Sequence, residues 1–138
     1  MKFQSLKILY TLLFALPILA QGQVAIAQNE HSEVVGVWKF SYQNQGGEVA
    51  GTLIIMEEDG GLEGNIKTDN GRTDSILKDV KFEEGLLSFK YTLSYNSQDL
   101  DMIFSAKISD KTMKGAIEVA SFNMGFDLMG TKEEESNN

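Results

Sequence analysis

The sequence predicts an all-β domain, an eight-stranded antiparallel up-and-down β-barrel, from three observations. Apolar and polar residues alternate along most of the chain, which is the period of strands with one buried face. Clusters of Gly, Asn and Asp, which suit tight turns, separate the alternating runs. After the first 27 residues, no stretch has the spacing of an amphipathic helix. Consecutive strands joined by short turns form a meander, and closure into a barrel removes its exposed edges.

The N-terminal segment has the three parts of a secretion signal. Lys2 and Lys7 come before an apolar run over 8–20, and the segment 25–27 supplies the small residues that a signal peptidase requires. The apolar run is shorter than the roughly 20 residues that span a membrane, and it contains a proline. We therefore expect 1–27 to be cleaved and the product to be exported, to the periplasm or the medium, with no membrane span.

The composition of the mature chain excludes several classes of function. Cleavage deletes Lys2 and Lys7 but no acidic residue, which takes the formal net charge from −8 to −10. A chain this acidic is repelled by polyanions, so nucleic acid is excluded as a partner. The chain has no cysteine, which excludes disulfides and thiolate metal sites. Its length suits one domain that buries its core unaided.

The expected organisation is a polar leader over 28–33, a barrel over 34–132 and an acidic, disordered tail over 133–138. Turns centred near 45, 60, 70, 84, 97, 110 and 121 divide the barrel into eight strands. Lys78 breaks the alternation of the fourth strand. A two-sheet sandwich is the alternative architecture. The clearest inward faces are Leu62, Ile66; Leu87, Phe89, Tyr91, Leu93, Tyr95; Leu100, Met102, Phe104, Ala106, Ile108; and Phe122, Met124, Phe126, Leu128.

Short glycine-led motifs mark the first and last strands. Gly36-Val37-Trp38 opens the first strand and Gly130-Thr131-Lys132 ends the last. With 51–53 and 59–64 between them, the chain resembles a small secreted bacterial lipocalin-like (calycin-type) β-barrel module, and the Gly-x-Trp motif is also found in avidins. The resemblance implies that Trp38 closes the barrel floor, with Gly36 at the entry and Lys132 over the ring. Biotin binding is not implied, because it needs several tryptophans.

The residues argue against catalysis. His31 is the only histidine, and it lies before the first strand, where we expect it to be exposed. A serine or threonine nucleophile needs a base to activate it, and no His or Cys partner is available. Asp99 and Asp101 alternate toward solvent. The sequence therefore predicts no enzyme activity, no catalytic residues, no metal site and no cofactor.

The meander also predicts two unlike barrel ends. The floor, with Trp38 and Lys132, takes the turns at 57–61, 83–85 and 109–112, which are mainly acidic. The mouth takes the connections at 43–48, 69–73, 95–99 and 120–123, which are rich in amides and hydroxyls. The mouth also carries the only arginine, Arg72.

Two functions remain open. The first is a non-enzymatic binding module that holds a small, partly apolar ligand in the barrel. The residues expected to contact that ligand are Tyr42, Tyr91, Tyr95, Phe104, Phe122, Met124 and Arg72. The alternative is a structural or protein-interaction domain with a packed interior and no ligand. The volume of the interior discriminates between them, because ligand cavities reach several hundred Å3 whereas packed cores leave about one water or less.

Overall fold

The computed structural model describes residues 30–136, so the predicted signal over 1–27 lies outside the described residues. A 3₁₀ turn, η1 (Glu30–Glu33), precedes nine strands. The strands are β1 (Gly36–Asn44), β2 (Gly47–Glu58), β3 (Gly61–Thr68), β4 (Asp74–Ile76), β5 (Lys78–Glu83), β6 (Leu86–Tyr95), β7 (Gln98–Ser109), β8 (Thr112–Val119) and β9 (Met124–Lys132). In this part of the chain no helix is long and apolar enough to span a membrane.

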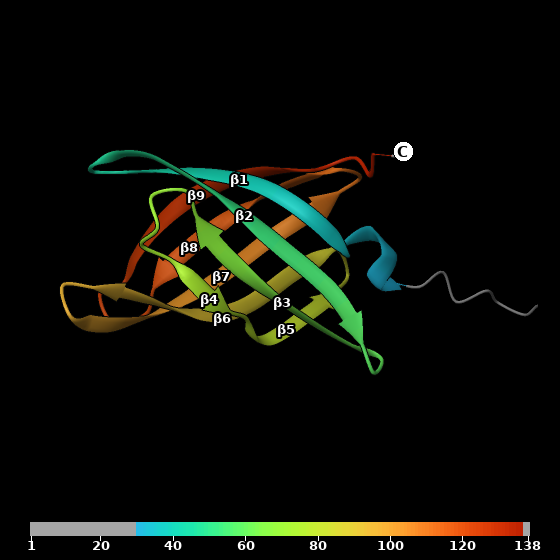
Figure 1. Ribbon diagram of the computed structural model, residues 1–138, viewed down its shortest axis with the longest axis horizontal. Coiled ribbons are helices and arrows are strands. Elements are labelled where there is room, and N and C mark those ends of the chain that lie inside the picture. The colour runs from blue at the N-terminus through green and yellow to red at the C-terminus, as the bar shows by residue number, and fades with distance from the viewer. Residues whose placement is uncertain (1–29, 137–138) are drawn as a thin grey trace, which may run out of the picture.

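The nine strands form one antiparallel sheet that curls into a nearly closed barrel (Figure 1). The sheet order is β4-β3-β2-β1-β9-β8-β7-β6-β5. β1 pairs with both β2 and β9, so the first and last strands lie side by side. Trp38 is opposite Leu53 on one side and Lys132 on the other. The chain therefore forms one curled sheet and not the alternative sandwich of two sheets.

The prediction of eight strands is wrong by one, because the fourth strand divides at Leu77. Its first part, β4, pairs with β3, and its second part, β5, pairs with β6. Two polar residues in succession, Lys78 and Asp79, interrupt the alternation there. The register shifts between Lys78 and Lys81, and Asp79 has a φ of 51°. Such a β-bulge bends its strand, which moves the second half to a new partner.

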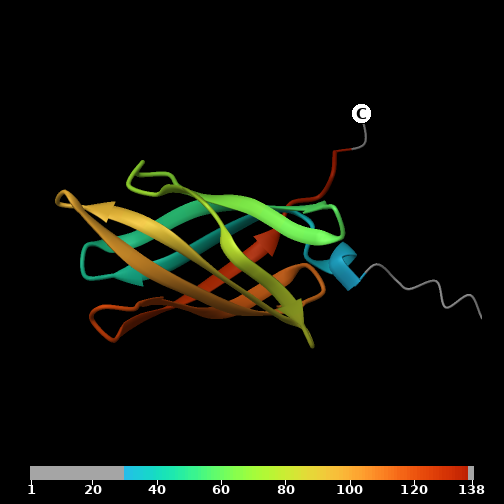
Figure 2. The same ribbon diagram turned by 90° about the horizontal axis from the view of Figure 1, so that it is seen from below.

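The β4–β5 segment crosses the seam of the barrel, where the two edges of the curled sheet meet. In Figure 2 this segment, coloured yellow-green, runs diagonally across the near side of the barrel. Leu77 is buried at the bend, and its N–H donates to the Gly64 carbonyl at 3.0 Å. Between β6 and β4, the Thr92 N–H donates to the Ser75 hydroxyl at 3.3 Å. These contacts connect the two edges where the regular strand ladder is missing.

The alternation in the sequence correctly predicts most of the core. Most inward residues of the long strands are buried, including Leu53, Phe104, Ile117 and Leu128, whereas Tyr95 and Met124, at the mouth ends of their strands, are exposed. The rings of Phe89 and Phe104 stack with centroids 4.2 Å apart. Among the described residues, only two polar ones are fully buried, and both lie near the mouth: Thr68 and Thr73.

The two ends are composed as the meander predicts. In Figure 1 the β1–β2, β3–β4, β6–β7 and β8–β9 connections gather at the left, which is the mouth. η1, the other turns and the C-terminal end lie at the right, which is the floor.

One residue, Phe122, lies elsewhere than the sequence predicts. Phe122 lies in the turn before β9 and not on the inward face of a strand, because β8 already ends at Val119.

Candidate functional site

The four mouth connections surround a cavity of about 750 Å3. Its rim carries amide groups and hydroxyls. Its base is apolar and is formed by the ends of β6, β7, β8 and β9. The base residues are Leu93, Leu100, Met102, Val119 and Phe126. This cavity opens to solvent between the mouth loops and reaches Met102 at its base, so side chains do not completely fill the mouth end of the barrel.

Five of the seven residues predicted to contact a ligand line this cavity: Tyr42, Arg72, Tyr95, Phe122 and Met124. They come from β1, β6, β9 and two mouth connections, so the fold brings together residues that are far apart in sequence. Three of them expose much apolar surface to solvent at the rim, with Tyr95 48%, Phe122 58% and Met124 42% exposed.

The other two predicted residues, Tyr91 and Phe104, lie deeper in the barrel. Both are buried in the hydrophobic core, and neither lines the cavity. Tyr91 is opposite Met102, which does line the cavity, so Tyr91 lies at the level where the cavity ends and the packed core begins. The alternation correctly showed that these residues point inward, but it carries no information about how deep the filled part of the barrel extends.

Tyr42 connects the cavity wall to the core. Its ring stacks on Phe40 at 6.5 Å between centroids and is tilted against Phe126 at 5.9 Å. Burial raises the pKa of the Tyr42 phenol, while the nearby positive charge of Arg72 acts to lower it. Burial also raises the pKa of Tyr91, and Tyr42 adds to that effect. Both phenols therefore keep their protons at neutral pH and remain hydrogen-bond donors.

The connection between β3 and β4 is held by its own hydrogen bonds. The Thr68 hydroxyl donates to the Asn70 side-chain oxygen at 2.7 Å, and the same oxygen accepts the Arg72 N–H at 3.0 Å. The Thr68 hydroxyl also accepts the Thr73 N–H at 3.0 Å. Gly71 has a φ of 75°, a left-handed conformation that glycine adopts without strain. This network fixes the backbone that carries Arg72.

At the floor, Trp38 fills the end of the core. Its ring is fully buried, and its indole N–H donates to the Val34 carbonyl at 2.8 Å. The Lys132 ammonium lies 5.7 Å from the ring centroid and donates to the carbonyls of Ser32 and Glu33 at 3.2 and 3.3 Å. Trp38 and Lys132 are therefore placed as the sequence predicts.

Gly36 permits this close approach at the floor. Its φ is 140°, and a Cβ there would lie 2.7 Å from Lys132 Cε. Any other residue would be strained in its backbone and would push the lysine stem away from the indole. The position therefore requires glycine, because a larger residue would collide with Lys132.

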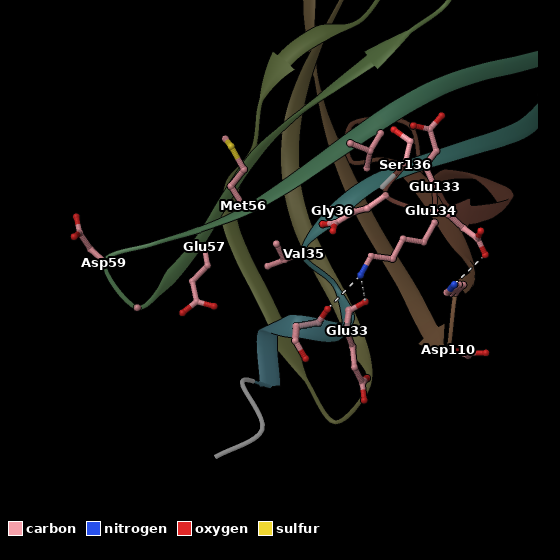
Figure 3. A pocket seen from close by; sticks show the side chains of 16 residues that line it. Glu33, Val35, Gly36, Met56, Glu57, Asp59, Asp110, Glu133, Glu134 and Ser136 are labelled. Carbon is pink, nitrogen blue, oxygen red and sulfur yellow. Dashed lines mark hydrogen bonds and ion pairs between the residues drawn. The ribbon is translucent and has the colours of Figure 1, made fainter. Parts of the chain in front are cut away.

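A second hollow, of about 1,550 Å3, lies outside the floor (Figure 3). It is larger than the mouth cavity, but it lies between the leader, two turns and the C-terminal tail and does not enter the barrel. In Figure 3 the carboxylates of Glu57, Asp59, Asp110 and Glu134 are spread around it and do not converge. In the described part of the chain, no three His, Asp or Glu residues come together as metal ligands. The hollow therefore offers no assembled binding site.

Charge repulsion is present on the same side of the molecule. Repulsion from the Glu58 carboxylate raises the pKa of Glu63. His31, which we expected to be exposed, has 25% of its side chain exposed, and its Nδ1 lies 3.3 Å from the Glu57 carboxylate. This contact attaches η1 to the end of β2. His31 therefore has a structural neighbour, which the sequence did not indicate.

Several cavity residues were missed by sequence reasoning. Leu93 and Leu100 pair across β6 and β7, and their alternation already placed them on the inward face. Their position near the mouth could have suggested a lining role. Thr68 and Thr73 are buried through their mutual hydrogen bonds, and no sequence pattern distinguishes them from other threonines.

No protein-family model matches this chain, and no curated protein matches its sequence, so the interpretation of the mouth cavity depends on the residues and contacts described above.

Proposed function

We propose that this protein is an exported, non-enzymatic binding module that holds a small, partly apolar ligand in the mouth cavity. The observation that supports this most is the cavity of about 750 Å3, which has an apolar base and a polar rim. Small-molecule sites commonly combine a volume of roughly 300–1,000 Å3, a mainly apolar lining and a few polar groups that orient the ligand. Phe126 and Leu100 would contact the apolar part of the ligand, and the phenols of Tyr42 and Tyr95 its polar part.

The absence of catalysis is part of the proposal. Thr68 lines the cavity, and its hydroxyl donates to the Asn70 side chain and accepts the Thr73 N–H. A nucleophile requires a base within hydrogen-bond reach, and an amide oxygen is not a base. The mouth hydroxyls and amides are therefore suited to orienting a ligand and not to reacting with it.

We further propose a lipocalin-like (calycin-type) relationship for the barrel. Its support is the Gly36-Val37-Trp38 entry, the buried indole beneath Lys132 and the pairing of β1 with β9. The lipocalin barrels that this chain resembles usually have an arginine at the position of Lys132. A lysine keeps the positive charge over the ring but has no planar group to stack on it.

Export follows from the sequence pattern of residues 1–27. We expect N-terminal sequencing of the protein recovered from the cell envelope or the medium to begin at or near Gln28. Recovery of a membrane-embedded product that still begins with Met1 would contradict export by a cleaved signal.

The function is tested by titration with N-phenyl-1-naphthylamine, a neutral apolar dye that fluoresces when shielded from water. We expect saturable binding at one site per chain. Phe122→Ala should weaken binding several-fold, whereas Ile76→Ala should not, although Ile76 is the more exposed of the two at 75% against 58%. Native mass spectrometry of protein purified from its own host would then search for the natural ligand. Failure of the dye to bind the parent protein would contradict the proposal.

The exposed rim supports one alternative function, a protein-interaction domain. Tyr95, Phe122 and Met124 present apolar surface on neighbouring mouth loops. Clustered aromatic and Met side chains are also enriched at protein interfaces. If the dye does not bind and no small molecule co-purifies, a partner protein that covers this rim becomes the better explanation.

A further inference from the structure

Few charged residues line the mouth cavity. Of the residues that line it, only Glu48 and Arg72 are charged. Arg72 is the only arginine in the chain, and no lysine within 30–136 lines the cavity. In a protein whose acidic residues outnumber the basic ones by 20 to 12, a cation at an apolar cavity is the exception to the general charge pattern.

The backbone that presents Arg72 is already ordered. Asn70 accepts the Arg72 N–H, and the Thr68 carbonyl accepts the Gly71 N–H, both at 3.0 Å. Thr68 and Thr73, which flank the loop, exchange backbone and side-chain hydrogen bonds. A site whose loop is ordered before binding loses less conformational entropy when the ligand arrives. Arg72 is therefore held at the rim and does not depend on the ligand to place its backbone.

Arg72 and Tyr42 both line the cavity. The positive charge of Arg72 is close enough to act on the Tyr42 phenol. Among the described residues the ion pairs are His31–Glu57, Lys39–Glu133 and Lys111–Glu134, so no carboxylate there neutralises Arg72. An arginine and a tyrosine that line one cavity offer several hydrogen-bond donors to an anion bound there.

A plain surface arginine would explain the exposure of Arg72. It would not explain why the only arginine lies at the cavity, on a loop braced by two buried threonines. Glu48 lies on the same rim and would repel a second negative group. These observations favour a ligand with one negative group and not a polyanion.

We propose that the ligand of the mouth cavity is an amphipathic organic anion, whose single carboxylate, sulfonate or phosphate ester is bound by Arg72 and the Tyr42 hydroxyl. Its apolar body lies against Leu93, Leu100 and Phe126 at the cavity base. This inference depends on the proposed binding function and adds the chemical class of the ligand.

Two dyes that share one ring system test it. 8-Anilinonaphthalene-1-sulfonate carries a sulfonate, and N-phenyl-1-naphthylamine lacks it. We expect Arg72→Gln to weaken binding of the sulfonate dye about tenfold, the loss of roughly one charge-assisted hydrogen bond, and to change binding of the neutral dye by less than about twofold. Arg72→Lys should restore part of the affinity for the sulfonate dye.

The matched control is Lys67→Gln. Lys67 is exposed on β3, five residues before Arg72, and it does not line the cavity, so the variant loses the same charge nearby. We expect it to bind both dyes like the parent. Equal weakening of the sulfonate dye by both variants, or equal weakening of both dyes by Arg72→Gln, would overturn the proposal while leaving the binding function intact. If neither dye binds the parent protein, the binding function fails and the anion site fails with it.

Discussion

The floor and the mouth of this barrel are built from the same strands but filled in different ways. At the floor, Trp38 occupies the whole end of the core, its indole N–H bonds to Val34, and Lys132 covers the ring. At the mouth, side chains do not fill the space between the loops, and a cavity of about 750 Å3 lies above Met102 and Phe126. The floor is one sealed layer, whereas the mouth is a ring of polar loops around an apolar space.

The difference shows how one small domain separates stability from recognition. Large buried rings contribute most to the free energy of folding, and loops with fewer buried contacts can change without unfolding the rest. A rigid base also holds the mouth residues in place, because β1 and β6 each carry a core residue and a cavity residue. Tyr42 lies two residues after the buried Phe40, and Tyr95 lies four after the buried Tyr91. Substitutions at the two ends should therefore have separable effects.

The largest effect is expected from Trp38→Ala. Truncating a fully buried Trp typically costs about 3–5 kcal/mol, against a typical domain stability of roughly 5–15 kcal/mol. We expect the variant to be close to unfolded, as measured by urea denaturation. Because Trp38 is the only tryptophan, the parent should emit at short wavelengths, as a shielded indole does.

The matched variant at the mouth is Tyr95→Ala, which removes a ring that is 48% exposed. Most such surface changes alter stability by about 0.5 kcal/mol or less. Equal destabilisation by the two variants, or a long-wavelength emission from the parent, would contradict the contrast between a sealed floor and an open mouth.

A smaller effect is expected at high pH, from Tyr91, which lies between the two ends. Burial raises the pKa of its phenol above the ordinary value of 10.0. Above that pH the unfolded chain loses the Tyr91 proton while the folded chain keeps it, so stability is retained below about pH 10 and falls as the pH rises further. One pH unit higher, at about pH 11, the loss from this group is about 1.4 kcal/mol.

The measurement compares the parent with Tyr91→Phe by urea denaturation at pH 8 and pH 11. Contributions that are the same in both proteins cancel in the difference. Parallel pH dependence in the two proteins would mean that the Tyr91 phenol is in contact with water through the cavity.

The smallest effect is expected from Lys132→Met, which keeps an unbranched apolar stem but loses the charge. The cation over Trp38 and its bonds to the carbonyls of Ser32 and Glu33 should together contribute about 1 kcal/mol. The control is Lys111→Met, which removes an exposed ion pair with Glu134 and should cost less than about 0.5 kcal/mol. Thermal or urea unfolding midpoints distinguish the two, and equal midpoints would show that Trp38 needs no cation.

Much of the architecture was predictable because one-sided burial leaves a direct pattern in the sequence. The alternation through Leu87, Phe89 and Tyr91 specifies which face of β6 is inside, and the Gly, Asn and Asp clusters specify where the chain reverses. Alternating strand direction then assigns every turn to the floor or the mouth. The same reasoning placed Trp38 beside Lys132, because antiparallel pairing of the first and last strands brings those two positions together.

The errors occurred where the local alternation does not determine which strands pair with each other. Lys78 visibly breaks the alternation, but the resulting division into β4 and β5 depends on which neighbour each half meets across the seam. Phe122 follows an inward rhythm in the sequence, yet the turn after Val119 takes it out of the strand. Backbone pairing decides such cases, and it involves residues that are distant in sequence.

The sequence by itself determined the all-β class, most of the inward faces and the assignment of each turn to one of two unlike ends. The tertiary structure alone decided how much of the interior is filled, because volume depends on how side chains from opposite walls meet. Tyr91 and Phe104 point inward like Tyr42, but they lie where Phe89 and Met102 close the space around them. The structure alone likewise set the braced loop that presents Arg72, since its hydrogen bonds join Thr68, Asn70 and Thr73 only when β3 and β4 pair.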